Sequence, residues 1–284
     1  MAYLHIDNLY KNQMILMFKE CYALEKVHGT SAHIGWKGDK ISYFSGGSKH
    51  ENFVALFDEA ALIERFVATG AADIVVYGEA YGGKQQGMRA TYGDKMRFIV
   101  FDVKIGGMWL SVPQMDEVAT SLGLEVVPWM RLDANIGDID YERDRVSIVG
   151  ERCGCPDKMR EGVVLRPLIE LTQNNGSRVI SKHKRDDFSE TKTPREVTPE
   201  ELQVLSDARE IAEEWVTPMR LTHVLDAMGG DVEIERMGDI IKAMLADIER
   251  EAEGEIVVSR DARKAISAST AAMFKARLQV ALHV

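Results

Sequence analysis

The chain has 284 residues, of which 45% are hydrophobic and 28% are charged, a balance that excludes a disordered or fibrous protein and indicates a sizeable core. Its 35 basic and 45 acidic residues give a formal net charge of -10. This acidity argues at first sight against a nucleic-acid partner, because phosphate binding usually needs a basic surface.

The first two thirds of the chain mix strands with two helices, as expected for an α+β domain with antiparallel hairpins. Residues 30–36 and 40–44 flank Lys37-Gly38-Asp39 and predict one hairpin. Residues 50–69 carry apolar residues at helical spacing and end before Gly70, which predicts a helix with a glycine C-cap. The remaining predicted elements are strands at 73–79, 96–105, 108–112, 162–168 and 177–184 and a helix at 114–122.

The last third of the chain is expected to be helical. Residues 191–199 (TKTPREVTP) are polar, contain two prolines and are typical of a linker, so we predict domains at 1–192 and 196–284. Thr198-Pro199-Glu200-Glu201 matches a capping box with proline at the first helical position. Further helices are predicted from Thr217-Pro218 to Gly229-Gly230, at 234–253 and at 259–282.

The negative charge is concentrated in one part of the chain. Residues 1–195 hold 25 basic and 27 acidic residues, whereas residues 196–258 hold five basic and 17 acidic ones. The acid excess therefore belongs to the first C-terminal helices, where it fits a solvated face. A net charge of -10 does not exclude contact with a few phosphates, and it predicts modest, salt-sensitive nucleic-acid binding.

Three cysteines are too few for a disulfide scaffold. Cys153-Gly154-Cys155 would need two more ligands to hold zinc, and His183 is the nearest downstream candidate, so a tight turn with reduced thiols is favoured. Residues 1–19 carry polar and charged residues throughout. We therefore expect no signal peptide, no membrane span and a cytoplasmic location.

Five short motifs carry residue types suited to phosphate chemistry. A lysine precedes a glycine by three residues in the first, and carboxylates stand at strand ends or beside an aromatic residue in the next three. In the last, Lys182 and Lys184 alternate along an extended segment and project from the same face. The motifs are EKVHGT at 25–30, YGE at 77–79, FIVFDV at 98–103, EGVVLRP at 161–167 and VISKHK at 179–184.

In this order the motifs resemble those of the covalent nucleotidyltransferases, the superfamily of ligases and capping enzymes. They are most similar to the RNA ligase 2 family of phage and kinetoplastid repair and editing ligases, in EKVHGTS, FDV, EGVVLRP and the KHKRDDFSETK tail. The resemblance spans about residues 26–192. It implies an α+β nucleotidyltransferase (ATP-grasp-like ligase) domain of antiparallel sheets with flanking helices, followed by a small all-α domain.

The resemblance implies an ATP-dependent RNA ligase with Lys26 as nucleophile. Lys26 would attack the α-phosphorus of ATP and hold AMP as a phosphoramide, which splits one hard displacement into two steps. AMP would then move to a 5′-phosphate end of RNA, and a 3′-hydroxyl would displace it. The attacking amine must be neutral, and the cationic Lys182 and Lys184 would favour that form and neutralise the phosphoryl oxygens.

The resemblance also assigns ligand roles. Phe101 would stack on adenine, Glu79 would bind the ribose hydroxyls and His28 would lie near the leaving pyrophosphate. Mg²⁺ (or Mn²⁺) prefers carboxylate oxygens, which suits Glu161 and Asp102. The implied nucleotide-binding residues are Glu25, Lys26, His28, Gly29 (where the backbone approaches the nucleotide), Glu79, Phe101, Glu161, Lys182 and Lys184.

Several of these residues also fit a purely structural role. Phe101 adjoins apolar residues and fits core packing, and Asp102 fits a structural partner of a lysine or a backbone donor. His33 is expected to be structural. Related ligases carry an arginine on the strand after the nucleophile, but residues 43–49 hold none, and Lys49 would be a point charge rather than a bidentate fork.

The expected partner is RNA with 3′-hydroxyl and 5′-phosphate ends, with a nicked duplex and a monomeric enzyme favoured, in the host cytoplasm for a phage-encoded chain. A DNA ligase and a capping guanylyltransferase are alternatives, but both append an OB-fold barrel, and no strand pattern follows residue 185. A non-catalytic RNA-end binding protein on a ligase fold, or an acidic helical adaptor, is the alternative of another class. The retained Lys26, Glu161, Lys182 and Lys184 argue against a decayed ligase, and the motifs upstream of residue 196 argue against an adaptor.

Overall fold

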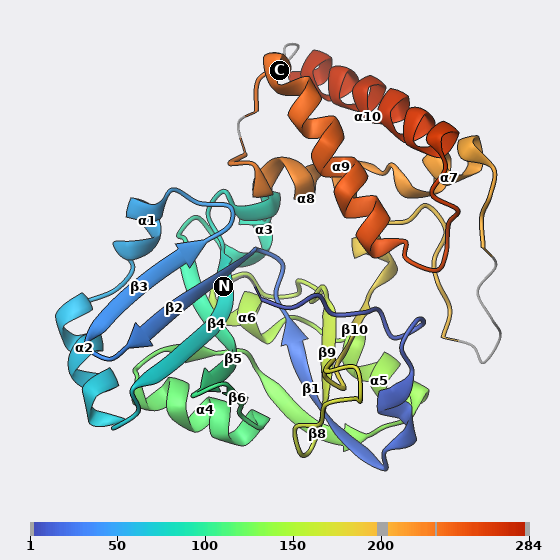
Figure 1. Cartoon of the computed structure of the whole chain (residues 1–284). Coiled ribbons are helices and arrows are strands. Elements are labelled where there is room, and N and C mark those ends of the chain that lie inside the picture. The colour runs from blue at the N-terminus through green and yellow to red at the C-terminus, as the bar shows by residue number, and fades with distance from the viewer. Residues whose placement is uncertain (1–2, 198–203, 231, 282–284) are drawn as a thin grey trace. The chain divides into compact units, whose positions relative to one another are not determined.

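The computed structural model describes residues 3–197, 204–230 and 232–281, and its chain forms two compact units, Met1–Arg185 and Asp186–Val284 (Figure 1). The boundary precedes the predicted linker, since the Lys192 amide already donates to the Glu214 carbonyl of the second unit at 2.9 Å. The predicted helix start at Thr198 to Glu201 lies outside the described residues.

The first unit mixes short helices with strands, as predicted for this part of the chain. Its helices are α1 (His50–Val54), α2 (Glu59–Ala68), α3 (Arg89–Tyr92), α4 (Val112–Ser121), α5 (Ile136–Arg143) and α6 (Ile148–Arg152), with 3-10 turns η1 (Met14–Met17) and η2 (Gln85–Gly87). Its strands are β1 (Glu20–Lys26), β2 (Thr30–Lys37), β3 (Lys40–Ser45), β4 (Asp73–Tyr81), β5 (Arg97–Ile105), β6 (Met108–Trp109), β7 (Glu125–Val126), β8 (Trp129–Asp133), β9 (Gly162–Pro167) and β10 (Ser181–Lys184).

Two sheets organise this unit. The larger has the order β3-β2-β4-β5-β6 with β7 also on β5, and the smaller has the order β10-β9-β1-β8. The pairs are antiparallel as expected, except that β7 runs parallel to β5, with Glu125 opposite Ile99. The smaller sheet therefore brings together strands from both ends of the unit's sequence.

Aromatic side chains join the helices to the larger sheet. Trp36 of β2 stacks on Phe66 of α2 at 5.5 Å between ring centroids, and Phe53 of α1 meets Phe98 of β5 edge to face at 5.4 Å. All four rings are buried, so the alternating apolar residues of the strands and the helical stripe of 50–69 share one core.

Three predicted elements differ from the structure. The strand expected at 108–112 is only β6, because Ser111 and Gln114 form a capping box that begins α4 at Val112. The single helix expected at 50–69 is two helices, because the Asp58 side chain accepts a hydrogen bond from the Ala61 amide at 3.1 Å and begins α2 as an N-cap. The strand expected at 177–184 is shortened to β10, since Val179 instead donates its amide to the Leu171 carbonyl at 3.0 Å. The hairpin of β2 and β3 is confirmed.

Strands β9 and β10 approach each other closely at Gly162, which lies opposite Lys184. A Cβ atom on residue 162 would lie 2.8 Å from the Lys184 Cα and nearer still to the His183 carbonyl oxygen. Both of those atoms belong to the backbone, so a side chain would force the strands apart. Glycine at this position therefore allows Lys184 to lie next to the residue before it, Glu161.

The described residues of the second unit form helices around a core of their own. They are η3 (Asp186–Phe188), α7 (Ala208–Trp215), α8 (Pro218–Ala227), η4 (Ile234–Arg236), α9 (Met237–Glu251) and α10 (Arg260–Ala281). Trp215, Ile240 and Phe274 are among the buried residues that form this core. Leu205 and Ile256 form an isolated bridge. Across the described parts of the chain, every helix is too short or too polar to cross a bilayer.

We predict that Gly162→Ala destabilises the first unit by about 2 kcal/mol or more, because the added methyl meets backbone on the facing strand. Urea unfolding followed by tryptophan fluorescence measures the change. Gly46→Ala is the control, since its Cβ would have ordinary contact with the Ser31 carbonyl oxygen at 3.4 Å. Equal stability of the two variants would contradict the close-approach argument.

Candidate active site

A cavity of about 260 Å³ lies where the two sheets of the first unit meet. Strands β1, β4, β5, β9 and β10 contribute to its wall, as does the segment before η1. The cavity collects five of the residues predicted to act on a nucleotide: Glu25, Lys26, Glu79, Phe101 and Lys182. Residues far apart in the sequence are thus assembled around one hollow.

Glu161 is the centre of the charged groups beside this cavity. Its Oε2 lies 3.0 Å from Lys26 Nζ and 3.1 Å from His28 Nδ1, and its Oε1 lies 3.2 Å from Lys184 Nζ. The Glu161 side chain has no exposed surface. Burial by itself would raise the pKa of Glu161, but the charges of Lys26, Lys184 and His28 hold it well below its ordinary value.

Strand register explains this convergence. Lys26 ends β1 opposite Gly162, the first residue of β9, and Gly162 also faces Lys184 at the end of β10. Antiparallel pairing therefore places the ends of β1 and β10 on either side of the start of β9. Glu161 precedes β9 directly and so lies between the two lysines.

Glu79 lies near the end of β4 and meets the segment that follows Lys26. Its Oε1 accepts a hydrogen bond from the Gly29 amide at 3.1 Å. Burial raises the pKa of Glu79 to about 8, against the opposing charge of Lys26 and with a contribution from Glu161. At neutral pH the structure therefore favours a protonated Glu79, which can donate as well as accept.

Glu25 lines the cavity and also holds helix α6 in place. Its carboxylate accepts hydrogen bonds from Ser147 Oγ at 2.5 Å and from the Ile148 amide at 3.0 Å, and Arg160 lies 3.7 Å away. Burial raises the pKa of Glu25. The Glu25 carboxyl thus anchors the first turn of α6 to the strand that carries Lys26.

Asp102 does not fit the predicted metal site. Its carboxylate is fully buried, with Oδ1 3.1 Å from Arg166 and Oδ2 2.6 Å from Arg178. The Tyr3 hydroxyl donates to Oδ2 at 2.7 Å, and the Val103 amide donates to Oδ1 at 3.0 Å. Both oxygens are therefore held by two guanidinium cations and two further donors, which favours the structural alternative for Asp102.

The segment before η1 also belongs to the site, and the sequence motifs did not predict this. Tyr3 to Ile6 line the cavity, and the Tyr3 ring meets Phe101 edge to face at 4.9 Å. The segment is fixed to β10, because Lys182 donates its amide to the Asp7 carbonyl at 2.9 Å and accepts from the Leu9 amide at 2.8 Å. No local pattern marks these contacts, since the partners lie at opposite ends of the unit's sequence.

Of the other residues considered in the sequence analysis, Phe101 lines the cavity, whereas His33 and Lys49 do not. Phe101 lines the cavity and is half-buried against the Tyr3 ring, so packing and ligand contact are compatible. His33 stacks on Phe44 at 5.0 Å and does not line the cavity. Lys49, the N-cap residue of α1, is exposed and does not line the cavity either. It therefore does not bring a positive charge to the cavity in place of the missing arginine.

A divalent cation fits this site only with ligands from the substrate. Within residues 3–197, 204–230 and 232–281, no three histidine, cysteine, aspartate or glutamate side chains form a group suited to a metal. Glu161 remains as a carboxylate beside Lys26, and its buried Oε1 has no hydrogen-bond partner among the residues that the structure describes. Mg²⁺ is commonly held by one or two carboxylates together with substrate phosphates, and Glu161 suits that arrangement.

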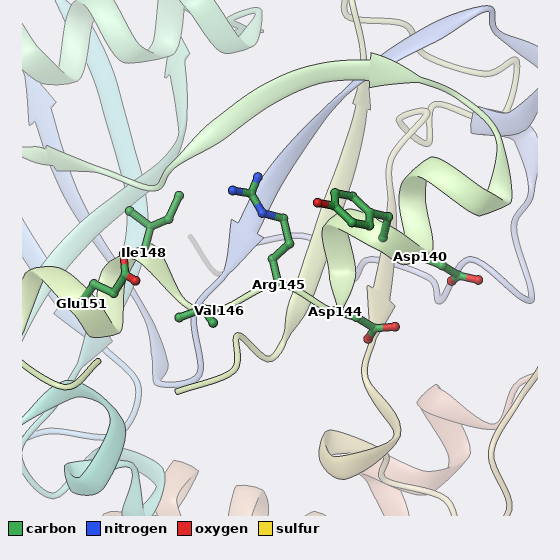
Figure 2. Close-up of a pocket in the computed structure, with 7 residues that line it drawn as sticks. Asp140, Asp144, Arg145, Val146, Ile148 and Glu151 are labelled. Carbon is green, nitrogen blue, oxygen red and sulfur yellow. The ribbon is translucent and has the colours of Figure 1, made fainter. Parts of the chain in front are cut away.

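A second, larger hollow of about 610 Å³ lies between α5 and α6 (Figure 2). Its side chains include Asp140, Asp144, Arg145 and Glu151, and none of the predicted site residues lines it. Two of its three carboxylates are already paired, Asp140 with His183 at 2.7 Å and Asp144 with Arg143 at 2.7 Å. The smaller cavity is therefore the candidate active site.

Comparison with known proteins gives the family of this chain. The family model described as RNA ligase matches residues 19–184, and no curated protein sequence is detectably similar. Three similar solved structures are RNA ligases of Naegleria gruberi: a variant with AMP and Mn, a variant with ATP and Mn, and the enzyme with PPi. Their TM-scores are 0.52, 0.52 and 0.53, each at 16% identity over 66% of this chain.

These structural matches share the fold of the first unit but not the whole length. This chain covers 57%, 56% and 57% of the three Naegleria chains, which is less than two thirds of each. At 16% identity the similarity shows the fold alone. The family match, in contrast, includes every strand from β1 to β10.

We predict that Asp102→Asn lowers the free energy of unfolding by about 3 kcal/mol, because it leaves two buried arginines with less compensating charge. Urea unfolding measures this loss. Titration with Mn²⁺ is the second readout, and we expect unchanged metal affinity. Weaker Mn²⁺ binding by a variant of normal stability would restore the metal role.

We predict that Glu79→Gln makes stability less dependent on pH. The pKa of Glu79 in the folded protein is about 8, above the ordinary value of 4.5, so the folded state binds more protons between these values and loses stability as the pH rises through them. The variant should be more stable than wild type by roughly 2–4 kcal/mol at about pH 9 and nearly equal at about pH 5.

Urea unfolding of both proteins at the two pH values checks this prediction. Glu64→Gln is the matched control, because it removes an exposed carboxyl of α2 rather than one inside the cavity. A gap between wild type and Glu79→Gln that stays constant with pH would refute the assigned protonation.

Proposed function

Since the chain belongs to the RNA ligase family, we propose that it is an ATP-dependent ligase that joins 3′-hydroxyl and 5′-phosphate ends of RNA through a lysyl-AMP intermediate on Lys26. The observation that carries this proposal is the contact of Lys26 and Lys184 with one buried carboxylate, Glu161, beside a cavity that also holds Glu79 and Phe101.

Lys26 is the proposed nucleophile. It ends β1 at the cavity, and its side chain is 23% exposed, so the amine is accessible to a bound nucleotide. Its Nζ forms an ion pair with Glu161 Oε2 at 3.0 Å. Attack on the α-phosphorus needs the neutral amine, so in our proposal Lys26 gives up this ion pair and its proton before the phosphoramide forms and pyrophosphate leaves.

Lys182, Lys184 and His28 are proposed to stabilise the transferring phosphoryl group. The two lysines stand two positions apart on β10, and Lys182 lines the cavity. Positive charge fixed beside the α-phosphate stabilises the oxygens that become more negative during transfer. A bound Mg²⁺, held by Glu161 and the phosphates, would add further charge neutralisation. His28 contacts Glu161 and would lie toward the leaving pyrophosphate.

The nucleotide is proposed to bind with its base on Phe101 and its ribose near Glu79. Aromatic stacking gives the base contact area at low entropic cost, and the Tyr3 ring supports Phe101 from its edge. A protonated Glu79 can donate to a ribose hydroxyl while the Gly29 amide occupies its other oxygen. Glu25 would contribute to the wall of the base site and keep α6 in position.

In the later steps AMP is proposed to pass to a 5′-phosphate, and an adjacent 3′-hydroxyl to displace it. A nick in duplex RNA holds these ends in place, which reduces the entropy cost of bringing them together. We propose that the helices of the second unit assist in engaging this substrate. The separate helical core around Trp215 is consistent with this assignment, and we propose that the enzyme acts as a monomer.

We predict that wild-type protein incubated with α-labelled ATP and Mg²⁺ becomes labelled and that Lys26→Ala abolishes the label. Lys37→Ala, at the exposed end of β2, is the control and should label normally. An undiminished adduct on Lys26→Ala, or none on wild type, would contradict the proposal. Preference for α-labelled GTP would favour a capping enzyme.

The substrate is tested by comparing nicked duplex RNA, nicked duplex DNA and single strands in the same reaction. We expect the nicked RNA to be sealed fastest. Equal sealing of nicked DNA would favour a DNA ligase, and a protein that binds RNA ends without forming any adduct would favour the non-catalytic alternative.

A further inference from the structure

The connection from β4 to β5 is a basic segment in an acidic protein. This basic loop, defined as residues 82–97, includes Arg97, the first residue of β5. It holds four basic residues and one acidic residue, whereas the whole chain has a net charge of -10. All four cations are exposed. Arg89 pairs with Asp94, while Lys84, Lys95 and Arg97 form no ion pair within the described residues.

The basic loop is attached directly to the segment that follows the proposed nucleophile. The His28 amide donates to the Tyr92 hydroxyl at 3.3 Å, and Thr30 Oγ1 donates to Gln85 Oε1 at 3.1 Å. His28 itself contacts Glu161. The loop therefore lies beside the proposed reaction centre, yet its exposed cations do not line the nucleotide cavity.

The backbone of the loop is folded tightly and at some cost. Gly82 has φ +75°, and a Cβ atom there would lie 3.2 Å from the Tyr92 carbonyl oxygen and nearer still to the Lys95 carbonyl oxygen. Gln86, which is not a glycine, has φ +52°, and its buried Oε1 has no hydrogen-bond partner among the described residues. Such concentrated strain is typical of segments under a functional constraint.

We propose that the basic loop binds the phosphate backbone of the RNA next to the end being joined. This inference rests on the proposed function and adds a substrate surface to it. Exposed lysines are point charges that bind phosphates without reading sequence, which suits an enzyme that engages many ends. Lys182 and Lys184 are committed to the nucleotide in the proposed reaction, so the RNA backbone needs other cations.

The test compares two matched charge reversals. Lys84→Glu/Lys95→Glu changes the basic loop, and Lys37→Glu/Lys40→Glu changes the turn between β2 and β3. That turn lies at the far end of the same strands, because Lys37 faces Asp73 while Thr30 faces Ala80, about 23 Å away along an eight-residue strand. Both variants alter two exposed lysines.

Binding of a labelled nicked RNA duplex with a 5′-phosphate is measured by fluorescence anisotropy from about 50 to about 200 mM salt. At the lower salt the loop variant should bind at least about tenfold more weakly than wild type. The slope of its log K against log salt should be less negative than that of wild type by about 2. The control should bind within about twofold of wild type. The charge-neutral Lys84→Gln/Lys95→Gln variant should fall between wild type and the reversal.

Formation of the lysyl adduct without RNA is measured in parallel and should be equal in all of these proteins. Absence of the adduct from wild type would overturn the proposed function, while the anisotropy still decides the role of the loop. Equal RNA binding by the loop variant and its control would overturn the inference. Joint loss of adduct and RNA binding in the loop variants would also overturn it, because the loop would then act on the nucleotide site or on folding.

Discussion

The ion pairs of Glu161 are the interaction on which the rest of the site depends. A fully buried carboxylate is unfavourable unless cations compensate it, and here Lys26, His28 and Lys184 all lie within 3.2 Å. The two lysines reach Glu161 because the ends of β1 and β10 lie on either side of β9. This arrangement requires the close approach of the strands at Gly162. The same three groups are the ones that our proposed chemistry uses, so the charge compensation of the unliganded fold also pre-positions the reacting groups.

A second buried charge network supports the opposite wall of the cavity. Asp102 binds Arg166 and Arg178, and Arg178 also lies 2.7 Å from Glu170, so two arginines and two carboxylates share one compensated cluster. Tyr3 ties this cluster to Phe101, because its hydroxyl bonds Asp102 while its ring packs on the phenylalanine. Neighbouring groups offset the desolvation cost of the carboxylates in both clusters. Of these two clusters, only that of Glu161 has a carboxylate oxygen without a hydrogen bond among the described residues, and our proposal uses that cluster for the reaction.

Patterns of neighbouring residues predicted those helices and strands that interactions between neighbouring residues determine. The β2–β3 hairpin follows from turn residues between alternating segments, and α8, α9 and α10 follow from apolar spacing and start and stop signals. Prediction failed where a competing local bond or a distant partner decides. The Asp58 cap divides one apolar stripe into two helices, and β10 is short because Val179 bonds to Leu171 instead of to β9. The arginine partners of Asp102 were not predicted, because nothing in its own strand indicates the arginines that contact it.

The sequence by itself determined the motifs, their order and hence the family, because residue identity and spacing are written along the chain. It also determined that the acid excess belongs to the C-terminal part rather than to the site. Only the tertiary structure decided which carboxylate is left for a ligand, since Glu161 and Asp102 look alike as acids and differ in the partners that strand pairing brings to them. It alone revealed the N-terminal wall around Tyr3 and the basic loop beside His28, because both arise from contacts between segments that are distant in sequence.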